Sequence, residues 1–244
     1  MNDQKNILIL GATSGIGKEI TAILSHDFSL LLSGRNKDKL TDLSALLQNK
    51  NKTIACDLAS DADLDNLAAT CPELDGLVFC SGVASSMPAR YIRREDIRTA
   101  MEVNFEGIVL TVARLLKLKK INPGASMVFI SSEAVRLPFF GSSVYSASKA
   151  ALEAYALTLA TELQPKKIRV NCISPAYVET PMLDQARTTM SADFVESMKK
   201  MHPEAFTSAT DIAGITSFLL SDKAASVNGQ IIKTGRFNIN IPGL

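Results

Sequence analysis

Short apolar runs alternate with amphipathic segments along almost the whole chain, and this alternation limits the folds that it can adopt. The apolar runs have the length of buried strands and fall at residues 5–10, 28–32, 53–56, 74–80, 127–130, 168–173 and 230–232. Helical spacing is found between them, at residues 14–24, 40–47, 61–70, 95–120, 145–163 and 210–220. The alternation predicts an α/β fold, a doubly wound parallel sheet of about seven strands with helices on both faces.

Proline and glycine mark two interruptions of this pattern. The run Asn122-Pro123-Gly124 is expected to stop the long helix at 95–120. Residues 175–207 contain Pro175, Pro181 and Pro203 among apolar residues, which predicts a loop with a broken helix that covers a substrate site. The sequence shows no internal repeat or linker, so a single domain over residues 1–244 is the simplest organisation.

Charge and cysteine content argue against several classes of function. The chain has 26 Lys and Arg residues against 25 Asp and Glu residues, a net charge of +1, so neither nucleic acid nor a membrane is expected as a partner. The four cysteines show no CxxC spacing and there are only two histidines, so no metal site is expected. The polar start resembles no signal peptide, which makes cytoplasmic residence the default expectation.

A glycine-rich turn follows the first predicted strand. It reads Gly11-Ala12-Thr13-Ser14-Gly15-Ile16-Gly17, with the spacing GxxxGxG, and it leads into the first helix. Glycines at such a place let backbone amides approach a phosphate, whose charge the helix N-terminus favours. The alternative is a purely structural turn, but the position directly after the first strand favours phosphate binding.

The residues that follow the second strand bear on how an adenosine ribose is recognised. An acid there binds the 2′-hydroxyl, whereas an arginine accommodates a 2′-phosphate. Here the segment is Ser33-Gly34-Arg35-Asn36, so Arg35 favours NADP(H) over NAD(H), with an exposed arginine at the start of a helix as the alternative. Asp57, after the third strand, is expected either to accept from an adenine amino group or to N-cap the next helix.

Tyr145 and Lys149 are four residues apart in the predicted helix 145–163, which places them on one face about one turn apart. An ammonium beside a phenol favours the phenolate, so this pair can transfer a proton near neutral pH, with Tyr145 as general acid/base. The alternative is a surface helix whose lysine extends into solvent.

Taken in order, five motifs resemble the short-chain dehydrogenase/reductase family: the GxxxGxG turn, Asp57-Leu58, Asn104, Ser132 and Tyr145-x-x-x-Lys149. The match extends from about residue 5 to 232. Within the family, the chain most resembles the 3-oxoacyl-carrier-protein reductases. The resemblance implies a Rossmann-type fold and hydride transfer with a nicotinamide cofactor.

The resemblance also implies roles for four residues. Tyr145 gives a proton to the carbonyl in reduction or takes it from the alcohol in oxidation, and Lys149 lowers the pKa of Tyr145 and holds the nicotinamide ribose. Ser132 hydrogen-bonds the substrate oxygen, and Asn104 anchors a water that links Lys149 to solvent. Taken alone, Ser132 is a strand-end cap and Asn104 a satisfied core amide.

The resemblance also implies that a segment after the sixth strand contacts the nicotinamide. In it, Val178 offers backbone groups to the carboxamide, and Thr180 offers a hydroxyl to the carboxamide or the pyrophosphate. The full set of implied cofactor contacts is Gly11, Thr13, Ser14, Gly15, Ile16, Gly17, Arg35, Asn36, Asp57, Leu58, Gly82, Asn104, Tyr145, Lys149, Pro175, Val178 and Thr180. The chain departs from the family pattern at 79–82, where only Gly82 is kept, at Ala176 and at 234–236. These departures concern the adenosine site and C-terminal contacts, not the catalytic groups.

The expected activity is NADP(H)-dependent interconversion of a carbonyl and an alcohol, with a 3-oxoacyl thioester or another ketone as substrate. Residues 181–203 and 135–140 are expected to wall the pocket, and Arg136, Arg187 and His202 either meet a polar substrate group or stay solvated. Lys166 and Lys167 are placed near its mouth, where they could meet an acyl carrier protein. A homotetramer or homodimer is expected from the resemblance. The alternative function is a catalytically weak cofactor-sensing or scaffold protein.

Overall fold

A seven-stranded parallel sheet forms the centre of the computed structural model, which describes residues 4–47, 51–84, 86–181, 183, 196–197, 199–200 and 205–235. The strand order is β3-β2-β1-β4-β5-β6-β9, so the order reverses between β1 and β4. The bounds are β1 Asn6–Leu10, β2 Ser29–Gly34, β3 Asn51–Ala55, β4 Leu74–Phe79, β5 Ile121–Ile130, β6 Arg169–Pro175 and β9 Ile231–Thr234. The predicted Rossmann-type fold is confirmed.

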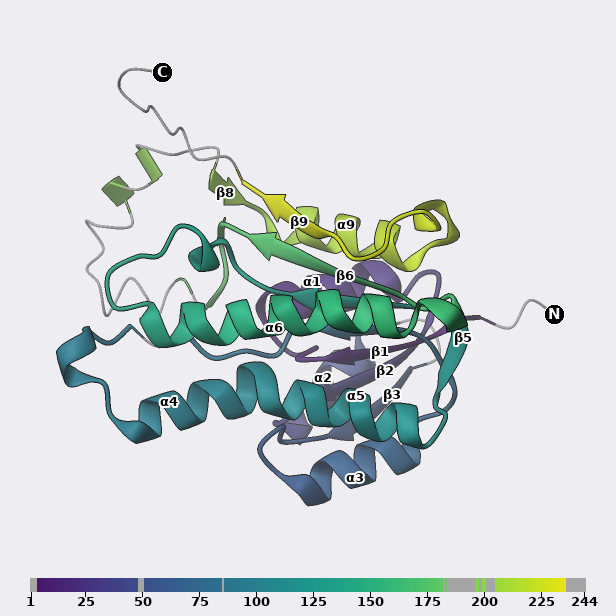
Figure 1. Cartoon of the computed structure of the whole chain (residues 1–244). Coiled ribbons are helices and arrows are strands. Elements are labelled where there is room, and N and C mark those ends of the chain that lie inside the picture. The colour runs from purple at the N-terminus through teal and green to yellow at the C-terminus, as the bar shows by residue number, and fades with distance from the viewer. Residues whose placement is uncertain are drawn as a thin grey trace.

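Helices cover both faces of the sheet (Figure 1). One face packs against α3 (Asp61–Thr70), α5 (Gly107–Lys117) and α6 (Ser143–Glu162). The other packs against α1 (Gly15–Leu24), α2 (Lys37–Ala45) and α9 (Ala209–Leu220). Strand β1 contributes apolar side chains to both faces of the sheet. Leu8 and Leu10 pack in the apolar cluster on the first face, Ile7 and Ile9 pack in the cluster on the second, and all four are at most 1% exposed. A strand buried on both faces has apolar residues throughout, which is the pattern read in the sequence.

The long helix predicted at 95–120 is a rod of three parts (Figure 1). It consists of α4 (Arg94–Met101), a π-turn η2 (Glu102–Glu106) and α5, which ends at Lys117. Gly107 is needed directly after the π-turn, because a Cβ there would lie 2.3 Å from the Leu58 carbonyl oxygen. A π-turn changes the phase of a helix, and it is frequent at functional sites.

The expectation that residues 122–124 stop this helix is wrong. The helix ends earlier, with Lys119 in the left-handed region at φ 56°, and residues 122–124 belong to β5. The register moves from Leu74 opposite Ile121 to Gly76 opposite Ser126, so β5 bulges between these pairs. The bulge accommodates a proline that cannot donate to the ladder.

Four short 3-10 helices and a second, small sheet complete the described chain. The 3-10 helices are η1 Ala89–Tyr91, η3 Glu133–Val135, η4 Gln164–Lys166 and η6 Asp222–Ala224. Strands β7 (Tyr177–Val178) and β8 (Phe206–Thr207) pair in parallel near the carboxyl end of β6. Met182, Arg187 and His202 of the predicted substrate loop, and Arg236, lie outside the described residues. Within the described residues, every helix is too short or too polar to cross a bilayer.

Candidate active site

The glycine-rich turn joins β1 to α1 by a close approach of backbone to backbone. Gly11 adopts φ 83°, and a Cβ on it would lie 2.6 Å from the Ser81 nitrogen. A Cβ on Gly17 would lie 2.0 Å from the Gly11 carbonyl oxygen, so Gly17 serves the packing of helix on strand. Ser14 precedes α1 without a side-chain cap, which leaves the first N–H groups of the helix available to a ligand.

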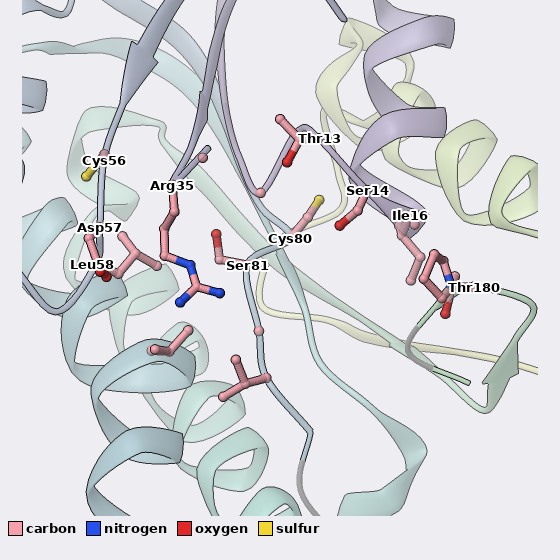
Figure 2. Close-up of a pocket in the computed structure, with 17 residues that line it drawn as sticks. Thr13, Ser14, Ile16, Arg35, Cys56, Asp57, Leu58, Cys80, Ser81 and Thr180 are labelled. Atoms are coloured by element: carbon pink, nitrogen blue, oxygen red, sulfur yellow. The ribbon is translucent and has the colours of Figure 1, made fainter. Parts of the chain in front are cut away.

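A cleft opens at the carboxyl ends of β1 and β4, where the strand order reverses (Figure 2). Ligands of open α/β sheets bind at such a switch point. Of the expected cofactor contacts, those that line the cleft are Gly11, Thr13, Ser14, Gly15, Ile16, Arg35, Asp57, Leu58, Gly82 and Thr180. The residues that line it without having been predicted as cofactor contacts are Gly34, Cys56, Cys80, Ser81, Val83, Val103 and Pro181. Most of these directly flank predicted positions at strand ends, which is the signal that could have found them.

The other expected contacts lie outside this cleft. Asn36 caps α2, with its side-chain oxygen accepting from the Lys39 N–H at 2.9 Å. Pro175 is the last residue of β6, and Val178 in β7 is only 8% exposed. The remaining ones are Gly17 at its packing position and the catalytic candidates Asn104, Tyr145 and Lys149.

Arg35 extends its guanidinium into the cleft (Figure 2). Its side chain forms no ion pair with the described residues, so its charge is available to an anion. Asp57 also lines the cleft, with Oδ1 accepting from the Ala59 N–H at 3.1 Å. The N-cap of α3 is Ser60, which accepts from the Asp63 N–H, so the capping alternative for Asp57 is wrong.

Tyr145 and Lys149 are both buried, at 8% and 4% exposed, which rules out a surface lysine that extends into solvent. Lys149 Nζ donates to the Ile130 carbonyl at 2.8 Å, and burial lowers the pKa of Lys149 to about 8. Burial raises the pKa of Tyr145, and a hydrogen bond with Ser132 acts in the opposite direction. Burial therefore sets the direction of the shift in this structure, and the lowering of this pKa by Lys149 stays a prediction.

Asn104 lies in the π-turn and is fully buried. Its Oδ1 accepts from the Val83 N–H at 2.7 Å, and Nδ2 donates to the Val83 carbonyl and to Ser148 Oγ, each at 2.9 Å. Both amide hydrogens are thus occupied, and Asn104 ties the segment after β4 to α6. Ser132 caps η3, because its Oγ accepts from the Ala134 N–H at 3.2 Å, and its own hydroxyl proton remains to be donated.

Two predicted substrate or partner contacts are elsewhere. Arg136 forms ion pairs with Glu133 and Glu153, which the sequence did not single out, and its side chain is 31% exposed. Lys166 and Lys167 follow the 20-residue helix α6, which begins near Tyr145, so they lie roughly 30 Å from it at the amino edge of the sheet. They are not near the mouth of the site.

Thiols and metal ligands add little to the described part of the site. Burial raises the pKa of Cys56 and of Cys80 to about 12, so the two thiols that line the cleft stay protonated at neutral pH. Among the residues that the structure describes, no three His, Cys, Asp or Glu side chains are grouped so that they could hold a metal ion.

Comparison with known proteins agrees with this geometry. The family described as Enoyl-(Acyl carrier protein) reductase matches residues 11–234. The 3-oxoacyl-(acyl-carrier-protein) reductase FabG of Rickettsia felis is 29% identical, over 93% of this chain and 94% of its own length. The human Dehydrogenase/reductase SDR family member 2, mitochondrial, is 30% identical, over 98% of this chain and 90% of its own.

Solved structures share the fold. An actinorhodin polyketide ketoreductase with NADPH superposes with a TM-score of 0.89 over 96% of both chains, at 24% identity. A short-chain type dehydrogenase/reductase from Mycobacterium ulcerans gives 0.83, at 27% identity, over 94% of this chain and 87% of its own. This chain therefore belongs to the short-chain dehydrogenase/reductase family, as an oxidoreductase of the 3-oxoacyl-carrier-protein reductase-like kind.

Proposed function

We propose that the protein interconverts a carbonyl and an alcohol with NADP(H), and that Tyr145 is the general acid/base. The observation that carries the proposal is the buried Tyr145 with the Ser132 side chain beside it and Lys149 one turn along the same helix. A phenol and a hydroxyl that meet at one point give the two donors that a developing alkoxide needs.

The cleft fits a dinucleotide phosphate. Its floor is the turn at Gly11, which admits no side chain, and its helix N-terminus favours negative charge. Arg35, which pairs with none of the described residues, provides a guanidinium beside Asp57, and this is the chemistry that a 2′-phosphate and an adenine require. When bound, the nicotinamide supplies or accepts the hydride. We assign the phosphates to the turn, the 2′-phosphate to Arg35 and the nicotinamide end to Val178, Thr180 and Lys149.

The chain's own residues handle the proton. Because burial raises the pKa of Tyr145, the phenol keeps its proton at neutral pH and can give it to a carbonyl oxygen. Ser132 donates a hydrogen bond from its hydroxyl group to the same oxygen, without giving up the proton. Lys149 holds positive charge behind the pair, and Asn104 fixes the Gly82–Val83 backbone beside it. The oxidation direction reverses these steps, so Tyr145 acts there in its deprotonated, phenolate form, which takes the proton from the alcohol.

An apolar acyl group fits the substrate side. Leu137 and Phe140 are 38% and 77% exposed in the segment after η3, which follows Ser132. A 3-oxoacyl thioester is therefore our first candidate substrate, and an acyl carrier protein our candidate partner, although Lys166 and Lys167 cannot serve as its docking site. We also propose a cytoplasmic homodimer or homotetramer of single-domain chains, which pair through α6 and through the rod made of α4, η2 and α5. A monomeric mass in solution would contradict this assembly.

The test is an initial-rate screen with NADPH and NADH over 3-oxoacyl thioesters, keto sugars and simple ketones. We expect turnover with NADPH to exceed that with NADH, and Arg35→Ala to weaken NADPH binding far more than NADH binding. Tyr145→Phe should lower kcat by about 100-fold to 10,000-fold while NADPH still binds. Full turnover by Tyr145→Phe would refute the assignment of the acid. Cofactor binding without turnover of any compound would favour a cofactor-sensing protein instead.

A further inference from the structure

A buried group of charges lies directly behind the catalytic residues. Arg136 Nη2 donates to Glu153 Oε2 at 2.7 Å, and Nη1 donates to Glu153 Oε1 at 3.2 Å and to Glu133 Oε1 at 3.3 Å. The glutamate side chains are 6% and 8% exposed, and that of Arg136 is 31% exposed. A two-point guanidinium–carboxylate pair defines orientation as well as distance, which a single charge contact does not.

This ion pair holds the catalytic segment at both flanks of Ser132. On one side, Ser131 Oγ donates to Glu153 Oε1 at 2.8 Å. On the other, Arg136 is paired with Glu153 and closes η3, because its backbone N–H donates to the Glu133 carbonyl at 2.9 Å. One carboxylate therefore binds both the residue before Ser132 and the residue four positions after it.

Helix α6 provides all of these anchors. Tyr145, Lys149 and Glu153 are spaced by four residues, so they share one face of the helix. Lys149 donates to the Ile130 carbonyl, Glu153 accepts from the Ser131 hydroxyl, and Tyr145 lies beside Ser132. The helix that carries the acid thus also sets the place of the hydroxyl that works with it.

We propose that Arg136 and Glu153 are positioning residues, which hold the Ser132 hydroxyl on the oxygen that Tyr145 protonates. The inference rests on the proposed function for its kinetic consequence. A displacement of about 1 Å in a reacting group can lower a rate by about 100-fold, so loss of the pair should lower kcat rather than raise KM.

The kinetic test uses Glu153→Gln and Arg136→Met, with Arg114→Met as the matched control. Glu153→Gln keeps an acceptor for Ser131 and leaves Arg136 paired with Glu133, so it is the variant most suited to fold. Arg114 also binds two carboxylates, Asp61 and Asp65, but between α5 and α3, away from the site. We expect kcat to fall by about 10-fold to 100-fold in the two test variants, with NADPH affinity unchanged, and to stay at the wild-type value in the control.

The Ser132→Ala background decides between positioning and a general structural effect. If the pair acts through Ser132, adding Arg136→Met to Ser132→Ala lowers kcat no further. An equal proportional loss with and without the Ser132 hydroxyl would overturn the proposal, as would unchanged kcat in both single variants.

Amide hydrogen exchange tests the inference without any substrate. Residues 131–137 should exchange faster in Arg136→Met and Glu153→Gln than in the wild type, and at the wild-type rate in Arg114→Met. Unaltered protection in this segment would overturn the proposal even if turnover is found. If the wild type turns over none of the compounds, the proposed function fails, and faster exchange still supports the anchoring of Ser132.

Discussion

Replacing Lys149 with methionine is expected to change how the stability of the folded protein depends on pH. The ammonium is 4% exposed and is held by the Ile130 carbonyl. Burial lowers its pKa from 10.5 to about 8, so the folded chain binds this proton more weakly than the unfolded chain does. The unfolded chain therefore carries more protons between pH 8 and 10.5, and wild-type stability rises with pH across this window.

The size of the effect follows from the shift of about 2.5 pH units. At about 1.4 kcal/mol for each unit, the folded state loses about 3 kcal/mol below pH 8 by holding the charge, and this loss disappears towards pH 10.5. Methionine removes the charge but leaves the Ile130 carbonyl without its donor, which costs about 1–3 kcal/mol at every pH. The free energy of unfolding of the variant, relative to wild type, should therefore fall by about 2 kcal/mol between about pH 7 and about pH 9.5.

Urea unfolding at both pH values measures this difference, with far-ultraviolet circular dichroism as the signal because the chain has no tryptophan. Lys120→Met is the matched control: its ammonium donates to the Cys71 carbonyl at 2.7 Å from a half-buried position. It shows the cost of losing such a hydrogen bond. If Lys149→Met changes stability by the same amount at both pH values, Lys149 is not held as a buried charge, and the reasoning is refuted.

Two further predictions concern packing. Gly17→Ala should destabilise the fold by more than about 3 kcal/mol, since its Cβ would lie 2.0 Å from the Gly11 carbonyl oxygen. Gly214→Ala, in open space on α9, should instead stabilise the fold by about 0.5–1 kcal/mol. Equal midpoints of urea unfolding for the two variants would contradict this prediction. Phe129→Ala should lower the free energy of unfolding by about 3–5 kcal/mol, because Phe129 is fully buried and stacks on Phe79 with the ring centroids 4.6 Å apart. A loss below about 1 kcal/mol in urea unfolding would refute this prediction.

The sheet could be predicted from the sequence because its strands are buried on both faces. Ile7, Leu8, Ile9 and Leu10 are all apolar for that reason, and the turn at Gly11 follows where backbone must approach backbone. These features depend on residues that are close in the chain, so a local pattern is sufficient to identify them. The bulge around Pro123 is different, since it depends on the register of β5 against β4.

The environments of Arg136 and Lys166 depend on residues that are distant in the chain. Arg136 meets Glu153, 17 residues further on, and nothing local distinguishes it from a solvated arginine. Lys166 was predicted near the mouth of the site, but most of the 20-residue helix α6 separates it from Tyr145. One feature of Asn104 could have been predicted from the sequence. Asn104 falls four residues before buried Ile108, on the same helix face, and a polar residue on a buried face requires hydrogen-bond partners.

Helix α6 shows why a catalytic surface is difficult to read as ordinary amphipathic structure. Its buried face carries Tyr145, Ser148, Lys149 and Glu153, so polar groups occupy positions that packing alone would give to apolar residues. The partners of these groups come from β5, the π-turn and the segment after β5, and each contact that satisfies a buried polar atom also orients it. The free-energy cost of burying Lys149 is tolerated because the apolar clusters on both sides of the sheet stabilise the fold independently of this face. The residues that break the helical pattern are therefore the ones to which the chemistry is best assigned.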